Sequence, residues 1–161
     1  MSISRSAFVS MMVAVAAVAL TSRAASAPRA QEASPGDKFA WAEACKSCHE
    51  EIYESWAKTK HARTIDRLSS SEQQQECVVC HTTGGIAKIE KDGKWVNRNV
   101  QCEACHGAGA AHAADPTNKV GLSKVPGARP CETCHNSKSP HFRGFVYQGM
   151  ARLSHAIPTK K

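Results

Sequence analysis

The amino-acid sequence predicts a mainly α protein made of short helices and much loop, with at most one small hairpin. Its 161 residues suffice for one modest domain. Aromatic residues make up only 6% of the chain, and its 10 glycines and 7 prolines further limit a conventional apolar core. All 8 cysteines fall into pairs of the form Cys-x-x-Cys. The mean hydropathy of −0.40 excludes a polytopic membrane protein.

Three stretches carry the pattern of short helices. Residues 50–62 predict a helix after the first cysteine pair, because Ile52 and Trp56 share one face of it. The polar residues 66–76 predict a second short helix that leads into the second pair. A last helix is expected over residues 146–155.

Glycine and proline mark the remaining backbone features. Asp92-Gly93 lies between two apolar stretches and predicts a hairpin turn. Gly107 and Gly109 follow the third cysteine pair and indicate a tight approach between backbones. Residues 116–130 are expected to be mostly loop.

The first 27 residues predict a secretory signal peptide. Arg5 precedes a run of ten apolar residues, and small residues up to Ala27 suit signal peptidase. A membrane-spanning helix needs about 20 apolar residues, so an uncleaved anchor is the less favoured alternative. We expect residues 28–40 to be a flexible lead-in and residues 41–161 to form one domain, exported by the Sec route to the periplasm or another compartment outside the cytoplasm. No stable membrane insertion is expected after cleavage.

A histidine directly follows every cysteine pair, and Cys-x-x-Cys-His is the attachment sequence of c-type haem. The two cysteines bond to the porphyrin, and the histidine ligates the iron. Disulfide frameworks, zinc ribbons and thioredoxin-like motifs do not require a histidine at this position four times over. The sequence therefore predicts four haem c groups, bound by Cys45, Cys48, Cys77, Cys80, Cys102, Cys105, Cys131 and Cys134 and ligated by His49, His81, His106 and His135.

Four further histidines match the four remaining axial positions: His61, His112, His141 and His155. Methionine is the other common ligand, but only Met150 lies outside the expected signal peptide. Bis-histidine ligation is therefore favoured. Only six residues separate His106 from His112, and the same number separates His135 from His141, which is too few to wrap a porphyrin. We therefore expect ligands that cross between motifs.

The cofactors also change how the core and the charge are interpreted. So little chain serves each haem that the haems themselves must form the core, with Tyr53 and Trp56 packed on them. The formal net charge of +7 is largely offset by eight haem propionates, so the basic chain does not predict nucleic-acid binding. The expected partners are redox proteins, and an acidic one could be steered by Lys58, Lys60, Lys160 and Lys161.

Two blocks of sequence resemble the tetrahaem cytochrome c-554 family. They are Ser55-Trp56-x-x-Thr59-x-His61-Ala62 and the segment from Asn99 to Gly107, with Ala108 where that family has proline. A weaker match at Ser139-Pro140-x-Phe142 extends the resemblance over residues 41–155.

The resemblance implies a haem-packed, mostly helical fold in which the first and third haems stack and the second and fourth form another close pair. It implies that His61 ligates the third haem, His112 the first and His155 the fourth. The second haem of that family is five-coordinate and high-spin. His141 is a departure from the family, because it is a spare histidine that could fill this vacancy.

The leading functional prediction is an electron-transfer protein that relays electrons through four haems. One alternative is a reductase of nitric oxide or another small nitrogen oxide at an open second haem, held by Cys77, Cys80 and His81. Another is a subunit of a haem filament, in which a histidine ligates iron in the next molecule. His141 discriminates among them, as a ligand within its own chain, as a bystander, or as a ligand across chains. No separate acid–base set demands catalysis, which favours a carrier over an enzyme.

Overall fold

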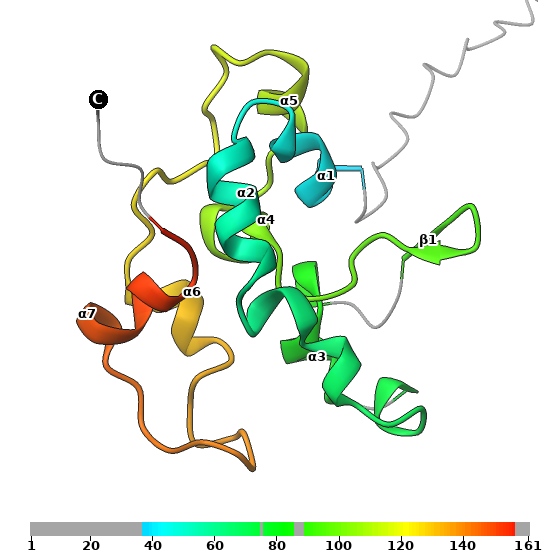
Figure 1. The fold of residues 1–161 in the computed structure, drawn as a ribbon, viewed down its shortest axis with the longest axis vertical. Coiled ribbons are helices and arrows are strands. Elements are labelled where there is room, and N and C mark those ends of the chain that lie inside the picture. The colour runs from blue at the N-terminus through cyan, green and yellow to red at the C-terminus, as the bar shows by residue number, and fades with distance from the viewer. Residues whose placement is uncertain (1–36, 75, 86–88, 157–161) are drawn as a thin grey trace, which may run out of the picture. The chain divides into compact units, whose positions relative to one another are not determined.

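The computed structural model describes residues 37–74, 76–85 and 89–156 (Figure 1). These residues belong to one unit of the chain. The expected signal peptide, most of the expected lead-in, Lys160 and Lys161 lie outside the described residues. Within the described part of the chain, no helix is long and apolar enough to cross a membrane.

Short helices dominate the described residues, which confirms the mainly α class. The longest helix, α2, has 8 residues. The α-helices are α1 Trp41–Lys46, α2 Glu50–Ala57, α3 Val78–His81, α4 Cys102–His106, α5 Ala110–Ala114, α6 Ala128–Glu132 and α7 Tyr147–Met150. Single 3₁₀ turns cover His61–Arg63, Ile65–Arg67, Glu72–Gln74, Thr83–Gly85 and Ala151–Leu153, and β1 Glu90–Lys91 pairs with β2 Lys94–Trp95.

Each Cys-x-x-Cys-His motif contains or adjoins one of these short helices. Motif four illustrates the local reason, because the amide of His135 donates to the carbonyl oxygen of Cys131 at 2.9 Å. Motif one has the same bond from His49 to Cys45, also at 2.9 Å. One helical turn therefore brings the two cysteines and the following histidine of a motif close together in space.

The two helices predicted before motif two are shorter than expected. Helix α2 ends at Ala57 rather than at residue 62, because the amide of Thr59 turns back to the carbonyl oxygen of Trp56 at 2.8 Å in a tighter turn. The prediction of one helix over 66–76 was wrong. Leu68 is extended, and the Glu72 carboxylate accepts the amide of Ser69 at 2.7 Å, which starts a new turn.

The predicted hairpin is confirmed. Strands β1 and β2 are antiparallel, with Glu90 opposite Trp95 and Lys91 opposite Lys94. The two turn residues Asp92 and Gly93 have φ values of 52° and 73°, as a two-residue type I′ turn requires. Residues 86–88, on the apolar side of the turn, lie outside the described residues.

The interior of the described part is polar rather than apolar. Its fully buried hydrophobic residues are Ala42, Ile65 and Val78, whereas the buried polar residues are Thr82, Thr83, Asn97, Gln101 and Glu103. Three small or medium apolar side chains bury far less area than a domain of this size needs. This small apolar core agrees with the expectation that the haems supply most of the apolar interior.

Two polar side chains at the start of α4, Gln101 and Glu103, connect motif three to α1 and α5. The Glu103 carboxylate accepts hydrogen bonds from the backbone N–H groups of Ala40 at 2.9 Å, Trp41 at 2.8 Å and Gly109 at 2.6 Å. The Gln101 amide oxygen accepts the N–H of Ala42 at 2.7 Å. Motif three is thereby joined to the first turn of α1 and to the entry of α5.

We predict that Glu103→Ala strongly destabilises the holoprotein. It leaves three backbone donors without their acceptor, and a buried unsatisfied donor costs about 1–3 kcal/mol. Glu132→Ala is the matched control, because Glu132 occupies the same position in motif four but is exposed, so we expect a change within about 0.5 kcal/mol. Denaturant unfolding followed by circular dichroism measures both. Equal stability of the two variants would contradict this role of Glu103.

Candidate haem-binding sites

The four motifs lie next to one another in a definite order. The interaction between the neighbouring thiols of Cys45 and Cys102 raises the pKa of Cys45 and lowers that of Cys102. Motif one therefore contacts motif three. The pKa of Cys80 is raised to about 11, first by burial and then by the nearby Cys134. Motif two therefore contacts motif four.

A third contact connects these two pairs. Burial raises the pKa of Cys105 to about 11, with smaller contributions from the charges of Cys131 and Cys134. Helix α4 also packs near α6. Motif three therefore lies beside motif four, and the motifs follow the spatial order one, three, four, two.

Three motif histidines face a histidine from another part of the chain. The ring centroids of His49 and His112 are 6.5 Å apart, with an interplanar angle of 22°. Those of His106 and His155 are 6.0 Å apart, at 29°. Those of His61 and His135 are 6.0 Å apart, at 69°.

These separations fit an iron between each pair of rings. With iron–nitrogen bonds of about 2 Å on each side, two imidazoles that share one metal have centroids about 6 Å apart. A second observation also fits a bound haem. The hydroxyl oxygen of Thr59, two residues before His61, is buried and has no hydrogen-bond partner within the described residues. This hydroxyl could donate a hydrogen bond to a haem propionate.

The ring contacts differ from two of the ligand assignments that the family resemblance implies. The structure places His61 against His135 of motif four, not against motif three, and His155 against His106 of motif three, not against motif four. The position of His155 is fixed by the residue that follows it. The amide of Ala156 donates to the hydroxyl of Ser55 at 2.6 Å and holds this segment beside α2. The placement of His112 against His49 agrees with the implied assignment.

Backbone carbonyls fix several of these imidazoles. A carbonyl oxygen only accepts, so a ring Nδ1 that bonds to one carries the hydrogen and leaves Nε2 free for a metal. The bonds run from Nδ1 of His81 to Thr64 at 2.8 Å, of His106 to Ser123 at 2.6 Å, of His112 to Asn118 at 2.9 Å, and of His155 to Ala156 at 2.8 Å. These carbonyl partners could not be predicted from any sequence motif.

The surroundings of motif two differ from those of the other three. Both His81 and His141 lie close enough to Glu72 for their charges to lower its pKa, although its hydrogen bonds to Ser69 are the main cause. His141 is exposed, and its amide donates to the Ser139 hydroxyl at 3.3 Å. Among the described residues, no ring is seen against His81 at the separation found for the other pairs.

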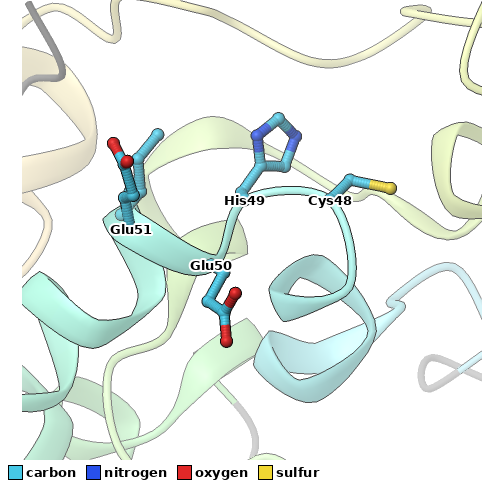
Figure 2. Close-up of a pocket in the computed structure, with 5 residues that line it drawn as sticks. Cys48, His49, Glu50 and Glu51 are labelled. Atoms are coloured by element: carbon cyan, nitrogen blue, oxygen red, sulfur yellow. The ribbon is translucent and has the colours of Figure 1, made fainter.

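A pocket of about 330 Å³ lies beside motif one. Its lining consists of Cys48, His49, Glu50, Glu51 and Ile52. Figure 2 shows the His49 ring and the Glu51 side chain pointing to the same side of the backbone, whereas Glu50 points away from them.

One aromatic side chain packs on a histidine pair, and two others pack on each other. Phe145 stacks on His135 at a centroid distance of 5.0 Å, a contact that no sequence pattern indicated. Tyr53 and Trp56 lie 5.4 Å apart, and Trp56 donates to the carbonyl of Val100 at 2.9 Å. The hydrogen bond from the Tyr53 hydroxyl to Glu43 is the main reason why its pKa is raised to about 12. Their packing on haem stays a prediction.

Comparison with known proteins agrees with the motifs. Residues 44–107 match the profile of the family described as cytochrome c554 and c-prime. This segment is therefore similar to the cytochrome c-554 family. The chain is 30% identical to the cytochrome c-554 of Nitrosomonas europaea in an alignment that covers 44% of this chain and 39% of the relative. It thus spans about two fifths of that relative's length.

The solved structure of the outer cell wall cytochrome OcwA is similar with a TM-score of 0.43 and 17% identity, over 61% of this chain and 37% of that one. This similarity and the motifs together support covalently bound haem c.

We predict that removing His61 affects the iron of motif four alone. In the otherwise unchanged holoprotein, His61→Ala should convert one low-spin ferric iron to high-spin, measured by electron paramagnetic resonance (EPR). In a background that lacks haem four, made by Cys131→Ala with Cys134→Ala, the same change should add no high-spin signal, whereas His155→Ala should add one. A new high-spin signal from His61→Ala in that background would instead assign His61 as a ligand of the haem of motif three.

Proposed function

We propose that this chain is an electron carrier that binds four haem c groups, three of them between two histidines. The observation that carries the proposal is the set of three ring pairs at 6.0–6.5 Å, each joining a motif histidine to one from elsewhere in the chain. When bound, haem iron supplies a reversible one-electron ferric–ferrous couple. Two histidines at one iron leave no position for a substrate, which suits electron transfer rather than bond making.

The order of the motifs supports a relay. The contacts run from motif one to motif three, from three to four, and from four to two. The residues that make them are the cysteines that attach the porphyrins, so neighbouring cofactors are held close together. Such a row gives electrons a continuous path between the motif-one and motif-two ends of the chain.

Motif two supports a second candidate function. His81 is oriented by its bond to Thr64, but no opposing ring is seen among the described residues. An iron held by His81 alone would keep one coordination position open to a small molecule such as nitric oxide. The second candidate is therefore reduction of nitric oxide or a related nitrogen oxide at this site.

The remaining proposals concern location and partners. We propose export to the periplasm, as the first 27 residues suggest, and transfer of electrons to and from other redox proteins. Lys58 and Lys60, just beyond α2, are exposed, so they are available to attract an acidic partner. Nucleic acid is not a proposed partner.

We predict that the purified holoprotein carries four haems per chain by mass, and that the EPR spectrum of the air-oxidised protein is mostly low-spin. About one quarter of the iron should be high-spin, and nitric oxide should change that signal alone. Turnover of nitric oxide with an electron donor would favour the second candidate, whereas binding without turnover favours the carrier. Fewer than three low-spin irons would contradict the proposed ligation.

We predict that His141→Ala leaves the EPR spectrum unchanged, because His141 is exposed and no ring contact between it and His81 is found among the described residues. His112→Ala is the comparison, since it removes the ring opposite His49 and should convert one more iron to high-spin. A new high-spin signal in His141→Ala would instead show that His141 is an axial ligand and that the iron of motif two has no open position.

A further inference from the structure

We propose that one loop, residues 115–127 between α5 and α6, sets the redox potentials of two irons together by fixing an axial histidine of each. The inference rests on the proposed function, because it assigns His106 and His112 to irons. It adds a positioning element that lies outside the Cys-x-x-Cys-His motifs and contains no haem ligand.

Two backbone carbonyls of this loop accept hydrogen bonds from the rings of His106 and His112. Ser123 makes a two-way contact with His106: its carbonyl accepts from Nδ1 at 2.6 Å, and its amide donates to the His106 carbonyl at 2.8 Å. Five residues earlier in the loop, the carbonyl of Asn118 accepts from Nδ1 of His112 at 2.9 Å. His106 belongs to motif three, and His112 faces His49 of motif one. One backbone segment therefore orients ligands of two different irons.

Local bonds give the loop its shape at the His112 end. The Asp115 carboxylate accepts the amide of Thr117 at 3.0 Å and its hydroxyl at 2.7 Å. The side-chain oxygen of Asn118 accepts the amide of Val120 at 3.1 Å. These Asx-type turns hold the Asn118 backbone, and so its carbonyl, in one orientation.

A close backbone approach holds the loop at the His106 end. Gly107, which follows His106 directly, has φ of 93° and lies against Gly121. A Cβ atom on Gly107 would be 2.2 Å from the carbonyl oxygen of Gly121, far inside van der Waals contact. Only glycine at residue 107 lets the loop come near enough for the Ser123 contact with His106. The tight approach predicted around Gly107 is therefore confirmed. It lets this loop pack against the backbone at residue 107.

The chemical consequence follows from the direction of the hydrogen bonds. An Nδ1–H that donates to a carbonyl makes the imidazole a stronger electron donor through Nε2. A stronger donor stabilises ferric over ferrous iron, which lowers the potential. Because both bonds end on the same loop, displacing the loop should raise the potentials at motifs one and three together, while motifs two and four keep theirs.

The test compares Gly107→Ala with Gly144→Ala in the holoprotein. Gly144 has the same φ of 93°, but a Cβ there would meet no atom within 4 Å. Both variants therefore place alanine at the same positive φ, and only the first displaces the loop. Potentiometric titration should show two of four midpoint potentials shifted upward in Gly107→Ala, with altered EPR g values for two low-spin irons and unchanged haem mass. Gly144→Ala should match the parent protein.

A milder variant keeps the proposal testable if Gly107→Ala fails to fold. Asn118→Ala removes only the side-chain oxygen that shapes the loop at the His112 end, so one potential, that of the iron between His49 and His112, should rise. Unchanged potentials in Asn118→Ala, or equal shifts in the two glycine variants, would overturn the proposal. Failure of the proposed function would be visible earlier, as fewer than four haems or no bis-histidine signals in the parent protein.

Discussion

The hydrogen bonds of the Glu103 carboxylate with three backbone N–H groups are the interaction on which the arrangement of motifs one and three depends. A carboxylate with 5% exposure is costly to bury unless its oxygens are paired, and the amides of Ala40, Trp41 and Gly109 pair them. The same bonds hold Trp41 at a φ of 67°, which is rare for a residue other than glycine. Motif three is thus the fixed point from which α1 and α5 extend, and α5 carries His112.

This polar anchoring explains how so few apolar side chains suffice. With Ala42, Ile65 and Val78 as the buried hydrophobic residues of the described part, the hydrophobic effect of the chain alone cannot offset the entropy of ordering it. The protein supplies geometry through backbone hydrogen bonds, and the cofactors supply the apolar area. Exposed hydrophobic residues such as Val79, which is 50% exposed between the cysteines of motif two, are where porphyrin faces would be covered.

Sequence reasoning identified what depends on neighbouring residues and missed what depends on distant ones. The four motifs, the Asp92-Gly93 turn and the tight approach at Gly107 each have a short-range cause, and each could be predicted. The contacts of His61 and His155 depend on packing between segments far apart in the chain, such as the bond between Ala156 and Ser55. Carbonyl partners such as Ser123 cannot be predicted from the sequence, because every residue has a carbonyl oxygen and no residue type marks the one that accepts.

The crossed pairing of histidines gives iron ligation a structural role as well as a redox one. Each ring pair joins segments that are many residues apart, and a bond that closes a long loop removes more entropy from the unfolded chain than one that closes a short loop. Covalent attachment tethers each haem to its own motif, and the second histidine then ties that motif to a remote segment. In the proposed ligation the irons act as cross-links, as metals do in small domains that lack a sufficient core. An open position at His81 would remove one such cross-link and would leave motif two dependent on its contact with motif four and on the bond from His81 to Thr64.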